Sequence, residues 1–190
     1  MMLEDKKRWN ERHVTKPISD KVANIVQKYL HLANVGDALD IAAGTGRNTH
    51  FMAEKGFVVD AIDYSDYALS QIKKLATINK IDTDLDKYHI KPNSYDLIVN
   101  CNFLDRRFFV QIKDGLKEGG LVIFETFIVA HGDTYHQPTN LDFVLRTNEL
   151  LHAFVGLNVI YYEERDEINL RGEKVRVASL VARKRDSCQN

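Results

Sequence analysis

The stretch DALDIAAGTGRNTHFMAEKGFVVDAIDYS, residues 37–65, decides the fold of this chain. Its apolar run ALDIA predicts a short buried strand, and Gly44 and Gly46 then predict a tight turn, since glycine accepts positive φ. RNTHFMAEK predicts a helix that ends at Gly56, and FVVDAI predicts a second strand, followed by Asp63. Ligands of such units bind beyond the carboxyl ends of the strands, so the stretch predicts a nucleotide-like binding site.

The rest of the chain continues the alternation of strand-like and helix-like segments. We expect Ser19, Ser65 and Thr147 to be the N-caps of three helices. Gly119 and Gly120 are expected to end a further helix, DRRFFVQIKDGLK. Five more strands are expected at 78–82, 95–101, 121–127, 157–168 and 174–184.

This alternation predicts an α/β fold with a doubly wound, mostly parallel sheet of about seven strands and an antiparallel C-terminal hairpin. A chain of 190 residues suits one domain, and no repeat or linker divides residues 1–190. Residues 128–146 are polar, aromatic and irregular, which is typical of a functional loop near an active site. Residues 184–190 are expected to form a loose tail.

Composition and charge argue against several classes of function. The chain has 26 basic and 27 acidic side chains, so no long-range field would draw it to nucleic acid or to an anionic membrane. The opening MMLEDKKRWNERH lacks the apolar core of a signal peptide, and no apolar run reaches the roughly 18 residues of a membrane span. Cys101 and Cys188 lie far apart and imply neither a disulfide framework nor a metal site. We therefore expect a cytoplasmic protein.

The glycine turn and Asp63 fit two kinds of cofactor. The helix start near Arg47 turns unpaired N–H groups toward a carboxylate or phosphate, and Asp63, 17 positions after Gly46, can accept both ribose hydroxyls. A dinucleotide prefers G-x-G-x-x-G, but Thr49 stands at the third glycine position. S-adenosylmethionine has no phosphate and needs the two glycines and the ribose acid, with Asp40 near its amino group. A tight turn without a ligand is the remaining alternative.

The glycine-rich run resembles the first motif of class I S-adenosylmethionine-dependent methyltransferases. The strands at 95–101 and 121–127 and the closing hairpin resemble the fourth, fifth, sixth and seventh strands of that Rossmann-like fold, whose seventh strand lies between the fifth and the sixth. Within the class, the chain is most similar to the small tellurite-resistance (TehB-like) and thiopurine methyltransferase-like group. RWNERH matches the W-[DN]-x-R-[YH] opening of that group, with Trp9 and Arg12 in the matching places.

The resemblance implies S-adenosyl-L-methionine as the cofactor and a residue set for each of its parts. Residues 1–32 would form an N-terminal lid and helix, with Trp9 over the cofactor. The implied contacts are Asp40, Ala42, Gly44 and Gly46 with the methionine tail, Asp63 with the ribose and Tyr64 beside it, Asp84 and Leu85 with the adenine, and Asn100 near the sulfonium.

Further residues are candidates for contact with a substrate. They are Trp9, Arg12, Arg106, His131 and Arg146. Several also have a structural interpretation: Trp9 as a packing residue of its helix, and Arg106 and Arg146 as surface groups. The histidines around His131 match no metal-ligand spacing, so no metal is expected, and a substrate-covering loop is favoured over a plain surface loop.

Together these features predict a methyltransferase that acts on a small molecule. Methyl transfer is a direct displacement in which the protein aligns the reactants and excludes water, so no catalytic motif is expected. The balanced charge favours a small acceptor over a nucleic acid. Two alternatives remain: an NAD(P)-dependent oxidoreductase, and a non-enzymatic nucleotide-binding module on the same fold. The sequence identifies neither the acceptor nor the oligomeric state.

Overall fold

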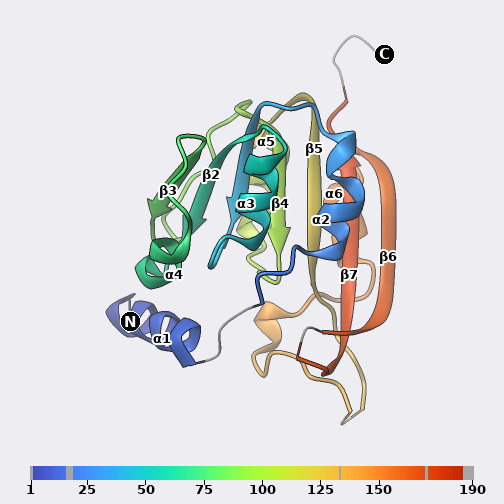
Figure 1. Cartoon of the computed structure of the whole chain (residues 1–190). Helices are drawn as coiled ribbons and strands as arrows, with labels where there is room; N and C mark the ends of the chain where they lie inside the picture. The colour runs from blue at the N-terminus through green and yellow to red at the C-terminus, as the bar shows by residue number, and fades with distance from the viewer. Residues whose placement is uncertain (1, 16–18, 133, 170, 186–190) are drawn as a thin grey trace.

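A seven-stranded sheet of order β3-β2-β1-β4-β5-β7-β6 organises the described part of the chain, which in this computed structural model is residues 2–15, 19–132, 134–169 and 171–185. β1 to β5 are parallel, and β7 runs antiparallel to both β5 and β6 (Figure 1). The predicted fold class and the place of the last strand are thus confirmed. The strands are β1 Asp37–Ile41, β2 Val58–Asp63, β3 Ile78–Asp82, β4 Tyr95–Cys101, β5 Leu116–Phe127, β6 Asn158–Ile168 and β7 Lys174–Arg183.

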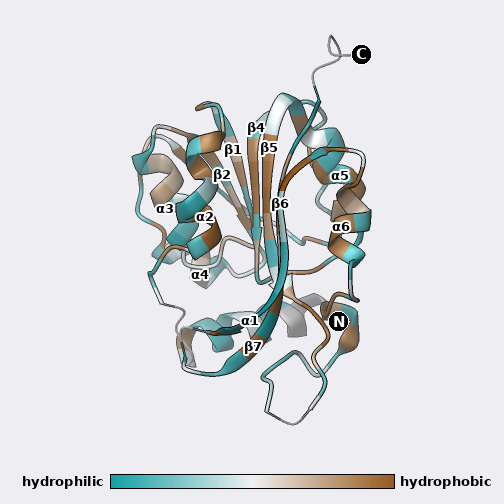
Figure 2. Cartoon of the chain, turned by 90° about the vertical axis from the view of Figure 1, so that its right-hand side faces the viewer, coloured by the Kyte–Doolittle hydropathy of each residue, from teal (hydrophilic) through white to brown (hydrophobic). Residues whose placement is uncertain are grey.

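Helices cover both faces of this sheet, as Figure 2 shows, with α2, α3 and α4 on one side and α5 and α6 on the other. The alternation along the strands produces the two cores: Leu97 and Val99 of β4 pack with α2 and α3, whereas Ile98 packs with α5 and α6. The helices are α1 Met2–Thr15, α2 Asn24–Tyr29, α3 Arg47–Glu54, α4 Asp66–Gln71, α5 Arg107–Gly115 and α6 Glu149–Phe154, with 3-10 turns η1 Leu30–Leu32 and η2 Leu141–Phe143.

One predicted N-cap is confirmed and two are wrong. Ser65 caps α4 by accepting the N–H of Ala68 at 3.0 Å. α2 begins at Asn24 and not at Ser19, because the chain before it stays extended and the N–H of Ala23 bonds the distant Asn48 Oδ1 at 3.1 Å. α6 begins after Asn148, and not after Thr147, because Asn148 takes φ 60° and donates its N–H to Glu164 Oε1 at 2.5 Å.

Two predicted boundaries also move. The helix expected to end at Gly119 and Gly120 ends at Gly115, and both glycines belong to β5. Lys184, expected in the loose tail, is tied to β5, since its N–H bonds Gly120 O at 2.8 Å and its Nζ bonds Leu116 O at 2.6 Å. Residues 186–190 of that predicted tail lie outside the described residues. The irregular segment 128–146 contains η2 and a bridge between Ile128 and Leu145.

The sheet has two free edges, β3 and β6. β3 exposes Asn79, Lys80 and Asp82, and β6 carries five consecutive charged residues, 163–167. Among the described residues, no helix combines the length and the apolar character that crossing a membrane requires.

Candidate functional site

The glycine turn after β1 is built from left-handed backbone. Ala42, Gly44 and Gly46 have φ of 53°, 57° and 85°, and the turn closes through a 3.0 Å hydrogen bond from Gly46 N to Ala43 O. A Cβ on Gly46 would lie 2.7 Å from Ile72 Cγ1, so only glycine fits between the turn and the residue that follows α4. Gly46 therefore shapes the turn from outside the cavity described next.

A cavity opens at the carboxyl ends of β1, β2 and β4, and α1 covers it. Its lining is Trp9, His13, Asp40, Ala42, Ala43, Gly44, Thr45, Arg47, Asn48, Asp63, Tyr64, Leu85, Cys101, Asn102 and Phe103. Six of the nine residues expected to bind the cofactor thus lie together, although they come from the ends of β1 and β2 and from the segment after β3. Gly46, Asp84 and Asn100 are not in the lining.

Asp63 connects the end of β2 to the glycine turn. Its carboxylate accepts the N–H of Gly44 on Oδ2 and the N–H of Ser65 on Oδ1, both at 2.8 Å, and the residue is only 7% exposed. Burial raises the pKa of Asp63, and the two N–H groups oppose that rise. Each carboxylate oxygen has a second lone pair, so Asp63 can still accept hydroxyl donors from a ligand.

Asp40 is the most deeply buried acid of the cavity, at 2% exposure. It accepts a 2.6 Å hydrogen bond from Thr49 Oγ1, which lies in the first turn of α3. Burial raises the pKa of Asp40 to about 7, and the bond from Thr49 and the charge of Arg47 only partly oppose it. A cationic group in the cavity would favour the ionised form of Asp40.

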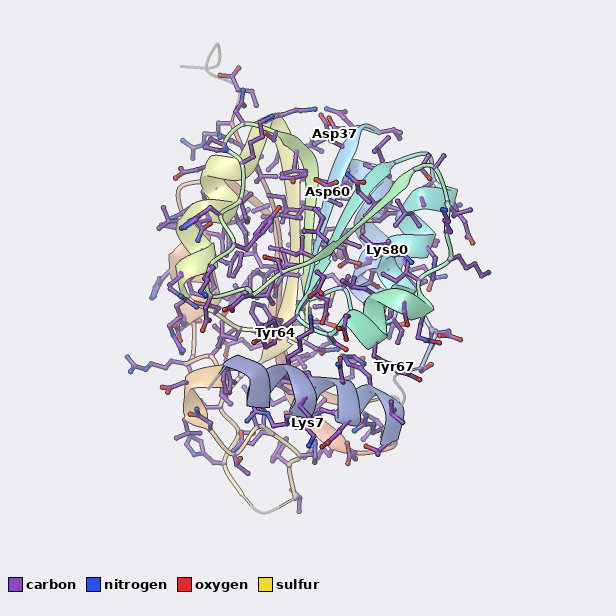
Figure 3. The ribbon with its side chains drawn as sticks, turned by 90° about the vertical axis from the view of Figure 1, so that its left-hand side faces the viewer. Lys7, Asp37, Asp60, Tyr64, Tyr67 and Lys80 are labelled. Carbon is purple, nitrogen blue, oxygen red and sulfur yellow. The ribbon has the colours of Figure 1, made fainter. Side chains whose placement is uncertain are left out.

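Asp84 lies next to the cavity, and its neighbour Leu85 lines it. Asp84 Oδ1 accepts the N–H of Asp86 at 3.0 Å, whereas Oδ2 is buried without a hydrogen-bond partner and has only Lys87 Nζ at 3.9 Å. One oxygen of this carboxylate therefore remains available to a donor. Tyr64, which also lines the cavity, lies between the strand ends and α1 in Figure 3.

Asn100 lies at the end of β4 but does not line the cavity, and it stabilises the turn that does. The residue is 1% exposed, and its Nδ2 donates to Phe103 O at 2.8 Å, which fixes the turn that follows β4. Cys101, Asn102 and Phe103 of this turn line the cavity in its place. Burial strongly raises the pKa of the Cys101 thiol, so this cysteine stays protonated and unreactive.

Polar contacts hold α1 over the cavity. Asn10 accepts the hydroxyl of Ser65 at 2.6 Å and donates to Asp66 Oδ1 at 2.8 Å, and Lys6 Nζ bonds Asp82 at 2.7 Å (Figure 3 shows α1 beneath the strand ends). That residues 1–32 act as a lid stays a prediction. Trp9 lines the cavity, whereas Arg12 does not and lies over the Trp9 ring, 5.2 Å from its centroid.

The other three substrate candidates lie away from the cavity. Arg106 donates to Glu149 Oε1 at 2.5 Å and to Val144 O at 3.0 Å, so it ties α5 to the 128–146 segment and to α6. His131 and Arg146 are exposed, and neither lines the cavity. Among the described residues, no group of three or more His, Cys, Asp or Glu side chains could hold a metal ion.

Sequence reasoning missed two buried polar side chains of the cavity, His13 and Asn48, and His13 belongs to the covering helix. This residue is 7% exposed, lines the cavity and follows Trp9 by one helical turn, with the two ring centroids 6.4 Å apart. Burial lowers the pKa of His13, and the charge of Asp63 partly offsets that effect. The spacing of four residues that puts Trp9 and His13 on one helix face was the available signal.

Unpartnered polar atoms gather around this cavity. Among the described residues, five buried side-chain atoms lack a hydrogen-bond partner: His13 Nδ1, Thr45 Oγ1, Asp84 Oδ2, Asn100 Oδ1 and Thr126 Oγ1. Two of them belong to lining residues, and two belong to residues adjacent in sequence to lining residues. Such atoms are few in folded proteins, so their concentration here indicates a place where a polar ligand supplies the partners.

The sequence model of the tellurite resistance protein TehB family matches residues 1–175. The chain belongs to this family. Its assignment to the TehB-like group of class I S-adenosylmethionine-dependent methyltransferases is thereby confirmed. The solved structure of TehB from Haemophilus influenzae superposes with a TM-score of 0.73 at 19% identity, over 93% of this chain and 67% of that one.

Two further proteins are similar to this chain. The 1,6-didemethyltoxoflavin-N1-methyltransferase of Burkholderia thailandensis superposes with a TM-score of 0.70 at 14% identity, over 97% of this chain and 87% of that one. At such identities the likeness establishes the fold. A tRNA (uracil(54)-C(5))-methyltransferase of Pyrococcus horikoshii is 29% identical over 84 residues, which is 43% of this chain and only 21% of that relative.

Proposed function

We propose that this chain transfers the methyl group of S-adenosylmethionine to a small-molecule acceptor. The observation that carries the proposal is Asp63, a buried carboxylate at the end of β2 that the N–H groups of Gly44 and Ser65 hold at the rim of a glycine-lined cavity. An acid in this place suits the two hydroxyls of a ribose.

The residues present fit the parts of this cofactor. Asp63 would accept the ribose hydroxyls, and Asp40 would face the amino group of the methionine tail, whose positive charge suits a carboxylate. Asp84 Oδ2, which lacks a partner, would accept the exocyclic amine of adenine, and Leu85 and Tyr64 would cover the ring system.

The turn completes the proposed cofactor site. Ala42 and Gly44 would let the methionine tail approach the backbone, Gly46 would keep the turn in shape, and Asn100 would hold the turn after β4 near the sulfonium. S-adenosylmethionine, when bound, supplies a methyl group that its sulfonium already activates. The contribution of this chain is then to orient the acceptor and to exclude water beneath α1, without a required base.

Three observations favour a small acceptor. The chain has a formal net charge of -1, which gives no general attraction to nucleic acid, and the relative named for a tRNA shares only 84 aligned residues with it. The Burkholderia enzyme, which aligns over 97% of this chain, is named for a small heterocycle. A cytoplasmic location agrees with this proposal and stays a prediction.

Calorimetric titration with S-adenosylhomocysteine, the expected product, tests the cofactor. The wild-type chain should bind it, and Asp63→Ala should abolish binding, whereas Asp114→Ala, a matched change at an exposed position of α5, should leave it unchanged. Thermal unfolding of the unliganded variants separates lost contacts from lost folding, and Asp63→Asn serves if the alanine variant is unfolded. Binding of a nicotinamide dinucleotide in place of S-adenosylhomocysteine would favour an oxidoreductase.

Turnover is tested by an acceptor screen that measures formation of S-adenosylhomocysteine. The acceptors should include chalcogen oxyanions, thiols, thiopurines and small amines, so that each nucleophile class is represented. Methylation of one class by the wild-type chain, and not by Asp63→Ala, supports the proposal. Tight cofactor binding with no turnover on any acceptor would favour a non-enzymatic nucleotide-binding module.

A further inference from the structure

We propose that His13 is a second ribose-binding side chain: it would hydrogen-bond the ribose hydroxyls of S-adenosylmethionine from α1, while Asp63 would bond them from the end of β2. This inference rests on the proposed function, because it names a further residue of the same cofactor site. It differs from the residues implied by the sequence, which place the ribose on Asp63 alone.

The first support is the state of the imidazole. His13 lines the cavity at 7% exposure, and its Nδ1 is buried without a hydrogen-bond partner. A buried nitrogen without a hydrogen-bond partner is unfavourable, so it is expected only where a ligand or another group satisfies it. Trp9 lies one helical turn before it on the same helix, with the ring centroids 6.4 Å apart, and lines the same cavity.

The second support is the position of His13 relative to Asp63. Asp63 is the acid whose charge acts on His13, and Arg12 is the neighbouring cation on the same helix, while Asp40 and Arg47 also line the cavity. Each oxygen of Asp63 already accepts one backbone N–H, and a carboxylate can only accept. A ribose hydroxyl that donates to Asp63 keeps its own lone pairs, and an imidazole N–H is the group that can donate to them.

Burial supplies the required protonation state. It lowers the pKa of His13, so the ring is neutral near pH 7 and offers one donor and one acceptor nitrogen. Two adjacent ribose hydroxyls, each both donor and acceptor, complement such a ring and a carboxylate together. Adenine and the methionine tail lack this pair of neighbouring hydroxyls.

The third support is the attachment of α1. Asn10, three residues before His13, bonds Ser65 Oγ at 2.6 Å and Asp66 Oδ1 at 2.8 Å, and Ser65 in turn donates its N–H to Asp63. The contact that fixes the lid thus lies two residues from the ribose acid. His13 is therefore positioned against the same side of the cavity as Asp63.

Binding of 5′-methylthioadenosine and of its 2′,3′-dideoxy analogue tests the assignment, because both lack the methionine tail and only the first has the ribose hydroxyls. His13→Phe keeps an aromatic ring but has no nitrogen. It should weaken the binding of 5′-methylthioadenosine by about tenfold and leave the affinity for the dideoxy analogue unchanged. Lys7→Ala, at an exposed position of the same helix, is the control and should change neither. His13→Gln, which keeps a hydrogen-bond donor and an acceptor, should lose less affinity for 5′-methylthioadenosine than His13→Phe does.

Equal weakening of both ligands by His13→Phe would overturn the assignment, since it would indicate an adenine contact or a purely structural role. Unchanged binding of both would overturn it as well. If His13→Phe does not fold, as judged from thermal unfolding without ligand, the same comparison is made with His13→Gln. Failure of the wild-type chain to bind 5′-methylthioadenosine or S-adenosylhomocysteine would instead overturn the proposed function.

Discussion

Replacing Asp40 with asparagine should stabilise the unliganded protein, by an amount that grows as the pH rises from about 4 to about 7. Asp40 is 2% exposed, and burial raises its pKa to about 7 from an ordinary value of 3.8. The folded chain therefore binds this proton more tightly than the unfolded chain does. Stability from this group is fully present below pH 3.8 and is lost as the pH rises to about 7, since ionisation then favours the unfolded chain.

The structure sets the size of the effect. The pKa values of Asp40 in the folded and unfolded chain differ by about three pH units, and each unit corresponds to about 1.4 kcal/mol. Ionisation of Asp40 therefore lowers the free energy of unfolding of the wild type by about 4 kcal/mol, and the variant does not undergo this loss. Asparagine fills the same volume, and its amide oxygen can still accept the hydroxyl of Thr49, now 2.6 Å from Asp40 Oδ2. For a chain of this length, such a difference corresponds to about 10 °C in melting temperature.

The assay is thermal unfolding of wild type and Asp40→Asn between pH 4 and pH 8.5. The melting temperatures should lie closest together at pH 4, separate as the pH rises with the variant higher, and keep a constant difference above about pH 7. Asp114→Asn, which removes an exposed acid from α5, controls for the change in net charge. A difference between wild type and Asp40→Asn that stays constant over this pH range would refute the reasoning. Under the proposed function, S-adenosylhomocysteine should stabilise the wild type more than the variant.

Three further predictions follow from individual contacts. Gly46→Ala places a Cβ 2.7 Å from Ile72 Cγ1 at φ 85° and should cost about 2 kcal/mol or more in urea unfolding, whereas Gly156→Ala, where the added Cβ meets open space, should cost less than about 0.5 kcal/mol. Arg106→Ala should lower the free energy of unfolding by about 1 kcal/mol and leave KM for an identified acceptor unchanged. A raised KM at unchanged stability would instead indicate that Arg106 contacts the substrate. Asn10→Ala removes the bonds that hold α1 and should speed limited proteolysis within residues 2–15, and equal cleavage rates would show that other contacts hold the helix.

The strands were the most predictable part of the fold. The runs at 78–82 and 95–101 match β3 and β4 to the residue: the second is a largely apolar run bounded by polar residues, and in the first Ile78 and Ile81 alternate with exposed polar residues at the edge of the sheet. The helix starts at Ser19 and Thr147 were wrong for a different reason. In each case a side chain distant in sequence, Asn48 or Glu164, takes a backbone N–H near the helix start, and no local pattern encodes that bond.

The residues of the candidate site likewise divide into those that local sequence predicts and those whose place depends on distant contacts. The turn around Gly44 and the acid Asp63 could be predicted, since their spacing along the chain sets their meeting at the strand ends. Arg106 is close in sequence to the end of β4, but its side chain bonds Glu149, which is 43 residues away, and it does not line the cavity. His13 was missed because its role depends on where α1 lies, and that position comes from polar contacts of Asn10 with the start of α4.

The two open edges of the sheet bear on how the protein behaves at high concentration. Unpaired backbone N–H and C=O groups along an edge strand invite a strand from another molecule. Edge-to-edge pairing of two β6 strands would bring together runs in which four acids surround Arg165, and β3 presents Lys80 and Asp82 at its own edge. Such encounters bring like charges together, so the folded chain should resist aggregation through β-strand addition, most strongly at low ionic strength.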